Sequence, residues 1–121
     1  MKKNKWNILF GILAGIFLVA AIGIGTMLDR GYGISTGRYL EARGGEALLI
    51  IQNSPIEMHN RTDVDLFENL DTGDEILVFH DGVAESYPGQ TSVHIVIKLG
   101  DGTIADIPQQ VIEQLTELGW L

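Results

Sequence analysis

The chain has 121 residues, of which 45% are hydrophobic, and its eight basic and 16 acidic residues give a formal net charge of −8. It contains no cysteine, which excludes a disulfide framework, a thiolate nucleophile and a zinc–thiolate centre. Residues 31–121 hold four basic and 15 acidic residues, and a domain this acidic repels nucleic acid, so the sequence predicts no nucleic-acid partner.

An apolar run near the N-terminus is the longest uniform segment of the sequence. Ile8 to Leu28 gives 21 residues without a charged side chain. An α-helix rises about 1.5 Å per residue, so about 20 apolar residues cross a hydrocarbon layer of about 30 Å. We therefore predict a single-pass transmembrane helix over residues 6–28 that anchors the protein in the cell membrane.

The charges that flank this run predict its orientation. Three lysines within residues 1–5 precede it, whereas one acid and one arginine follow it directly. Because the cytoplasmic flank of a span carries the excess of basic residues, residues 1–5 are expected in the cytoplasm and the C-terminal domain outside it. The alternative is cleavage as a signal peptide at the small residues of Ala21–Gly23, although the run exceeds a signal-peptide core of about 7–15 residues.

The first part of the remaining chain predicts a linker followed by a hairpin. Residues 29–35 contain two glycines and no periodicity, which is typical of a juxtamembrane linker. A small β domain is expected over residues 36–107. Its first two strands, residues 36–42 and 47–52, flank a Gly-Gly pair that predicts a tight turn. The second strand is apolar on both faces and is therefore expected to be central.

Strand signals then alternate with turns. Residues 56–70 are polar and predict an irregular connection, whereas residues 75–80, 91–99 and 103–106 predict strands. Within residues 91–99, alternation places apolar residues on one face and polar residues on the other. We expect the apolar face to point into the core: Val93, Ile95, Ile97 and Leu99.

Residues 108–121 predict a C-terminal amphipathic helix. Pro108 suits the start of a helix, and Gly119 suits the position just after its end. Its apolar stripe consists of Val111, Ile112, Leu115 and Leu118. Five short strands with turns about every ten residues predict a small, mainly antiparallel barrel or curled sheet that this helix covers.

Turn and loop residues between the strands form a recurring pattern, which reads Leu70-x-x-Gly73-Asp74, then Asp81-Gly82, then Glu85-Ser86-Tyr87-Pro88-Gly89-Gln90. Over about residues 36–99 the chain resembles an uncharacterised family of small extracytoplasmic domains in Gram-positive bacteria. The resemblance implies an OB-like β-barrel, borne on a lipoprotein or on a membrane-anchored chain. Two departures are the glycine at position 89, where alanine is usual, and the apolar run in place of a lipidated cysteine.

The Glu85–Gln90 block is where this resemblance is densest. Glu85, Tyr87 and Gln90 are therefore the candidate residues for binding a ligand or partner. In the alternative interpretation, Tyr87-Pro88 buries an aromatic ring and makes a bend, at which Glu85 or Gln90 hydrogen-bonds to the backbone.

Histidines offer a second alternative. His80 and His94 lie at facing ends of two strands that are expected to pair, so a metal-assisted or hydrolase-like site with Asp81 or Glu85 is geometrically conceivable. His94 lies on the polar face of its strand, however, where a surface histidine is the ordinary explanation.

The sequence contains no nucleophile elbow, no phosphate-binding glycine loop and no zinc-protease motif. We therefore predict a non-enzymatic, membrane-anchored β-barrel module without a cofactor, which binds a partner protein or a cell-envelope ligand. A further alternative is an accessory subunit of another membrane protein, paired through the small residues Gly11 and Gly15 of the apolar run. The sequence leaves the oligomeric state open.

Overall fold

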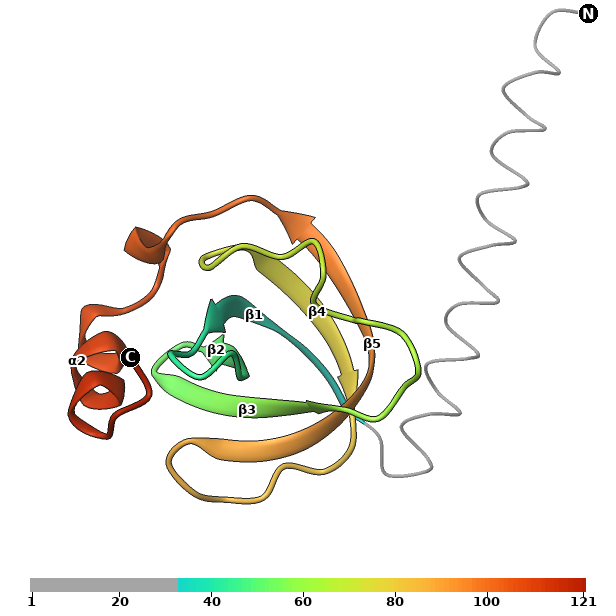
Figure 1. The fold of residues 1–121 in the computed structure, drawn as a ribbon, viewed down its shortest axis with the longest axis horizontal. Helices are drawn as coiled ribbons and strands as arrows, with labels where there is room; N and C mark the ends of the chain where they lie inside the picture. The colour runs from blue at the N-terminus through green and yellow to red at the C-terminus, as the bar shows by residue number, and fades with distance from the viewer. Residues whose placement is uncertain (1–32) are drawn as a thin grey trace, which may run out of the picture. The chain divides into compact units, whose positions relative to one another are not determined.

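Five strands, a short 3-10 helix and one α-helix follow one another in the computed structural model, which describes residues 33–121. The elements are β1 (Gly33–Glu41), β2 (Ala47–Ile51), β3 (Ser54–Asn60), β4 (Glu75–His80), β5 (Gly89–Gly100), η1 (Ile104–Asp106) and α2 (Gln109–Glu117) (Figure 1). The predicted hairpin, the strand over residues 75–80 and the C-terminal helix are confirmed.

The strands close into a barrel in the order β1-β2-β3-β5-β4, with β4 paired back to β1. Four of the pairings are antiparallel, but β3 and β5 run parallel. The chain reverses direction between β3 and β4 and again between β4 and β5, so β3 and β5 point the same way. They are neighbours in the closed barrel and therefore pair in parallel. The predicted small five-stranded barrel is thus confirmed, whereas its antiparallel character holds for every pair except this one.

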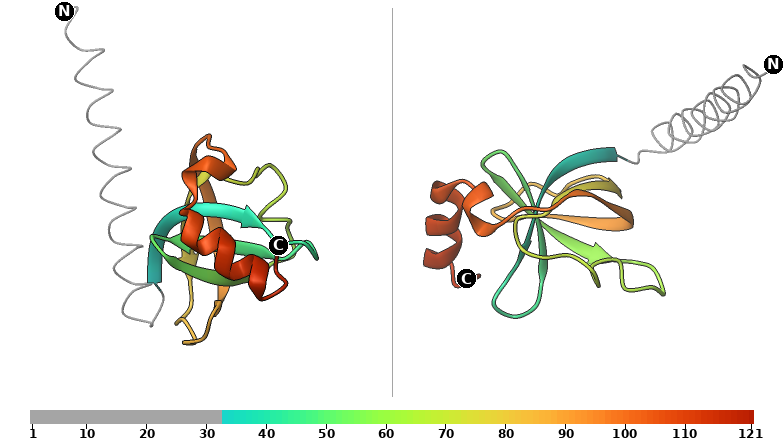
Figure 2. Two further views of the ribbon diagram at one scale, coloured as in Figure 1. Left: turned by 90° about the vertical axis from the view of Figure 1, so that its left-hand side faces the viewer. Right: turned by 90° about the horizontal axis from the view of Figure 1, so that it is seen from above.

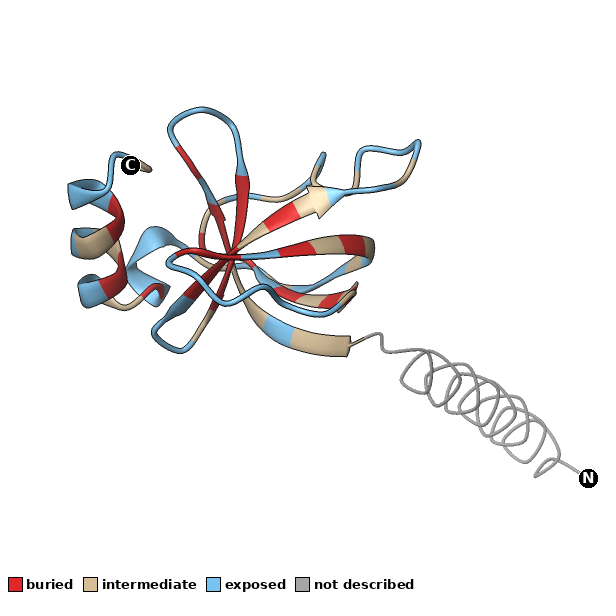
Figure 3. Ribbon diagram, turned by 90° about the horizontal axis from the view of Figure 1, so that it is seen from below, coloured by how far each residue is buried: buried red, intermediate tan, exposed pale blue. Residues whose placement is uncertain are grey.

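Two apolar clusters hold the fold together. The inner core fills the barrel and consists of Tyr39, Ala47, Leu49, Ile56, Met58, Ile76, Val78 and Val93. The second cluster lies outside the barrel, where Val111 and Leu115 of α2 cover Leu40, Leu48 and Ile50 of the β1–β2 hairpin. Figures 2 and 3 show α2 on one side of the barrel and the buried segments of the strands converging inside it. Both faces of β2 are buried, as expected for a central strand.

The irregular connection expected over residues 56–70 is wrong for its first five residues, which belong to β3. A two-residue turn at Gln52, with φ of 53°, joins β2 to β3 and leads directly into the pair Ile51–Ser54. Pro55 obscured the strand in the sequence. It lies one residue before the parallel ladder to β5 begins at Ile56, and the start of a strand tolerates a missing N–H.

The predicted inward face of β5 is confirmed only for Val93. One extra residue, His94, interrupts the pairing, because Phe79 pairs with Ile95 whereas His80 pairs with Val93. This β-bulge shifts the alternation by one residue, so the following odd-numbered side chains turn outward. The prediction is wrong for three residues, whose exposed fractions are 42% for Ile95, 47% for Ile97 and 50% for Leu99.

Three further details differ from expectation: one boundary, one element type and the burial of one side chain. β1 begins at Gly33, so the last part of the predicted linker is strand. The expected strand over residues 103–106 is η1, because the Thr103 hydroxyl accepts from the Ala105 N–H (3.3 Å) and the Asp106 carboxylate accepts from the Thr103 N–H (2.8 Å). Leu118 is exposed rather than packed, since it follows the last turn of α2.

Predictions for residues 1–5, for the transmembrane helix over residues 6–28 and for the first residues of the linker lie outside the described residues. Within residues 33–121, no helix combines the length and the apolarity that a membrane crossing requires.

Candidate binding loop and its polar support

The loop between β4 and β5, residues 81–88, contains most of the predicted site. Two backbone hydrogen bonds close its base: the Ala84 N–H donates to the Gln90 carbonyl (2.8 Å), and the Gln90 N–H donates to the Ala84 carbonyl (3.2 Å). At the tip, the Ser86 hydroxyl donates to the carbonyl of Pro88 (2.6 Å), which follows a cis peptide bond. The loop is therefore stabilised by its own polar groups, but the side chain that bonds to the backbone at the bend is Ser86 rather than the expected Glu85 or Gln90.

Tyr87 attaches this loop to α2. Its hydroxyl donates to Oε1 of Gln114 at 2.5 Å, and 43% of the residue stays exposed. Partial burial raises the pKa of the Tyr87 phenol above its ordinary value of 10.0. The expected burial of this ring is wrong, because the ring lies against the surface of a helix that covers the barrel rather than inside the core.

A hollow of about 310 Å³ lies where the loop meets the helix, lined by Tyr87, Gln114, Glu117 and Leu118. The tyrosine ring and the exposed leucine supply apolar surface, while Gln114 and Glu117 supply polar groups. Sequence reasoning missed the contribution of α2, because it assigned Leu118 to the apolar stripe that packs on the sheet.

The other two predicted residues do not converge on this hollow. Gln90 is exposed and lines a different hollow of about 490 Å³, together with His59, Arg61 and Asp81. Glu85 is exposed at the tip of the loop, and among residues 33–121 it has no hydrogen-bond or ion-pair partner. Tyr87 is thus the one predicted residue that lies at the junction of loop and helix.

His80 contacts the first residue of the loop and β1. It is buried at the end of β4, and its Nδ1 lies 2.6 Å from the Asp81 carbonyl oxygen, to which it must donate because a carbonyl only accepts. In the neutral ring, Nε2 therefore accepts from the Ser35 hydroxyl at 2.7 Å. Gly33 lets the ring pack closely, since a Cβ there would lie 2.7 Å from Cε1 of His80.

Asp81 joins the two predicted histidines through different atoms. Its carbonyl binds His80 and also accepts from the Thr91 hydroxyl (3.1 Å), while its Oδ1 lies 2.7 Å from Nε2 of His94. The structure thus brings together His80, Asp81 and His94, but not Glu85. Ser35 and Thr91 carried no sequence signal, because the barrel register alone places them here. In the part of the chain that the structure describes, no three His, Asp or Glu side chains gather in a way that could hold a metal ion.

The Gly73-Asp74 part of the recurring pattern lies elsewhere and ties two turns together. Asp74 is 1% exposed, and its carboxylate accepts from the N–H of Asp71 (2.8 Å) and of Gly102 (3.2 Å), with Nζ of Lys98 at 3.4 Å. These hydrogen bonds, led by the one from Asp71, hold the pKa of Asp74 below its ordinary value despite burial. Gly73 has φ of +99°, and a Cβ there would lie 2.1 Å from the Thr103 carbonyl oxygen.

Fold and site define the protein as a small mixed β-barrel domain with a C-terminal helix and a braced loop between its last two strands. No protein-family model matches the sequence, and no curated protein matches it as a relative.

Proposed function

We propose that the protein is a non-enzymatic, membrane-anchored module whose extracytoplasmic barrel binds a partner protein in the hollow between Tyr87 and α2. The observation that carries this proposal is an exposed tyrosine and an exposed leucine beside each other on a loop and a helix that are already braced. A surface that needs no ordering on association keeps more of its contact energy as affinity, and tyrosine is enriched among the residues that dominate protein interfaces.

The charges around the hollow indicate the chemistry of the partner. Glu117 lines the hollow, and Glu85 is exposed in the loop that carries Tyr87. Residues 31–121 as a whole carry 15 acidic and four basic residues. A segment with one apolar anchor flanked by basic residues would complement this surface. The membrane anchor over residues 6–28 and the kinship with the Gram-positive OB-like family belong to the same proposal and rest on the sequence patterns.

Site-specific photo-crosslinking in intact cells tests the proposal. A crosslinking amino acid at Leu118 should capture one defined protein, and the capture should be lost when Glu117→Lys is added. The matched control is Val64, which is exposed on the β3–β4 connection away from the hollow, and it should capture nothing. Equal capture from both positions, or capture that is insensitive to Glu117→Lys, would refute binding at the hollow.

The Ser35–His80 contact favours hydrolase-like chemistry as a second candidate. A serine hydroxyl hydrogen-bonded to Nε2 of a histidine, whose Nδ1–H is held by a carbonyl, has the order of groups that activates a nucleophile. A fluorophosphonate probe would label the wild type and not Ser35→Ala if this reading holds. Absence of labelling in the wild type would leave Ser35 as the group that satisfies a buried histidine.

A further inference from the structure

The outer surface of β1, β4 and β5 carries several apolar side chains. Ile76 and Val78 of β4 point into the inner core, so Leu77 and Phe79 between and beside them point outward. Ser35 points inward to His80, so its neighbour Ile34 points outward. With the residues that the bulge turns outward, these form the apolar sheet face, which consists of Ile34, Leu77, Phe79, Ile95, Ile97 and Leu99.

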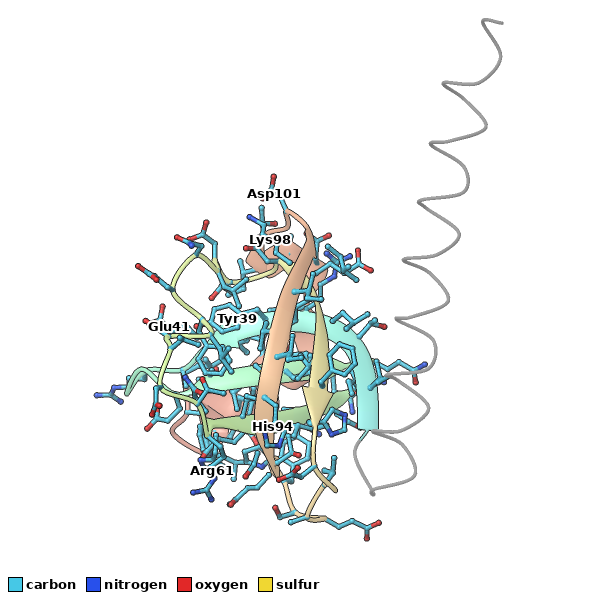
Figure 4. All side chains as sticks on the ribbon, turned by 90° about the vertical axis from the view of Figure 1, so that its right-hand side faces the viewer. Tyr39, Glu41, Arg61, His94, Lys98 and Asp101 are labelled. Carbon is cyan, nitrogen blue, oxygen red and sulfur yellow. The ribbon has the colours of Figure 1, made fainter. Side chains whose placement is uncertain are left out.

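Register arranges these side chains in rows across the three strands. Ile34, Phe79 and Ile95 are paired neighbours and form the first row, and Leu77 and Ile97 form the second row beside Thr36. The third row holds the charged residues Arg38 and Glu75 near Leu99. Figure 4 looks onto β5 and β4, with His94 near one end of this surface and Lys98 and Asp101 at the other.

No element in the described residues covers this face. α2 lies on the outer surface of the β1–β2 hairpin instead, where it buries Leu40, Leu48 and Ile50. Ile95, Ile97 and Leu99 are each at least 42% exposed on consecutive outward positions of one strand. A contiguous apolar surface that is exposed to solvent marks a site of contact with a partner or with lipid.

The first row lies at the end of β1 that is nearest in sequence to the apolar run. Five residues lie between Leu28 and Ile34, which makes six residue-to-residue steps, and a fully extended chain spans at most about 3.5 Å per step. If residues 6–28 cross a bilayer, Ile34 cannot be more than about 20 Å from the end of that span. Such an anchor would keep the wholly apolar row within this distance of the membrane, while the row with Arg38 and Glu75 lies further along the strands from Ile34.

We propose that the apolar sheet face rests in the interfacial layer of the lipid bilayer that the anchor spans. This inference depends on the membrane anchor of the proposed function, but not on the hollow beside Tyr87. The polarity gradient along the strands favours lipid over a second copy of the chain, since face-to-face packing of two sheets would bury the charged row as well. The charge of the barrel favours uncharged or zwitterionic lipid, because its excess of acids opposes anionic headgroups.

The lack of cysteine makes a single-label experiment clean. The full chain is reconstituted into phosphatidylcholine nanodiscs as Thr36→Cys, whose exposed side chain lies in the second row, and as Val64→Cys, which is exposed away from the face. Both variants carry an environment-sensitive fluorophore. At position 36 we expect a blue shift and a loss of fluorescence when the lipid carries a doxyl quencher, with neither change at position 64. Adding Ile97→Ser to Thr36→Cys should weaken the quenching.

The outcomes separate the two proposals. A chain that does not co-purify with the nanodiscs would refute the anchor. A chain that co-purifies but keeps a water-exposed label at position 36 would refute only the bilayer contact. A blue-shifted label that doxyl lipid does not quench would mean that protein covers the face, a second copy included, and would also overturn the proposal.

Discussion

Replacing Asp74 with alanine should lower the unfolding free energy by about 3 kcal/mol. The variant leaves the N–H groups of Asp71 and Gly102 without their carboxylate acceptor, and a hydrogen bond to a charged group contributes about 1.5 kcal/mol or more. In a domain of this size each kcal/mol shifts the melting temperature by about 4–8 °C, so the expected drop is roughly 12–24 °C. Urea denaturation and thermal scans followed by circular dichroism measure both quantities.

Asp101→Ala is the matched control. Both aspartates contact the ammonium group of Lys98, but Asp101 is closer, with its Oδ1 2.5 Å from Nζ against 3.4 Å for Asp74. The hydrogen bond from Lys98 to Asp101 is the largest of the causes that raise the pKa of Lys98. The side chain of Asp101 is 89% exposed, however, so water replaces the contact and stability should hardly change. If Asp101→Ala destabilised the barrel as much as Asp74→Ala, the argument from burial and backbone hydrogen bonds would fail.

The pH dependence has a definite sign. Because the folded-state pKa of Asp74 lies below its unfolded value, its contribution is complete above the unfolded pKa of about 3.9 and is lost as the pH falls through the folded pKa. The difference in unfolding free energy between the wild type and Asp74→Asn should therefore shrink below about pH 4. A difference that stays constant down to pH 2 would show that the charge of Asp74 does not contribute.

Further substitutions test the bulge, the glycines and the loop. Val93→Ala should lower the unfolding free energy by about 2–3 kcal/mol through lost burial and a cavity, whereas Ile95→Ala should lower it by about 1 kcal/mol or less. Comparable urea midpoints for the two variants would disprove the change of alternation at the bulge. Gly73→Ala should cost more than about 3 kcal/mol because of its positive φ and the clash with backbone, whereas Gly89→Ala, whose Cβ would meet its nearest atoms at 3.3 Å, should stay within about 1 kcal/mol in the same assay. Tyr87→Phe should change stability by only about 0.5 kcal/mol, since its hydrogen bond is exposed, but should increase protease cleavage within the loop if the contact with α2 braces it.

The sequence predicted the elements that local signals control. Gly44-Gly45 predicted the first hairpin, and the apolar run of β2 predicted a central strand. Gly119, with φ of +86°, follows the end of the helix as expected. Features that depend on partners distant in the chain were missed. The bulge at His94 has no local signature, because its cause is the register against β4.

The candidate site was predictable in part. The loop followed from the Glu85–Gln90 pattern, and the meeting of His80 with Asp81 and His94 followed from the expected pairing of their strands. The contact of Tyr87 with Gln114 joins residues 27 positions apart through the placement of α2, and Ser35 reaches His80 across 45 positions. Periodicity and turn chemistry carry no information about such contacts.

The position of β5 has a consequence for how the chain folds. β5 is the last strand in sequence, yet it lies between β3 and β4 and completes the hydrogen bonds of both. Until residues 89–100 have been synthesised, β3 and β4 each present an open strand edge, and such edges recruit strands from other chains. A chain truncated after His80 should therefore associate with copies of itself rather than form a smaller stable sheet. Only the synthesis of β5 satisfies both open edges and closes the barrel.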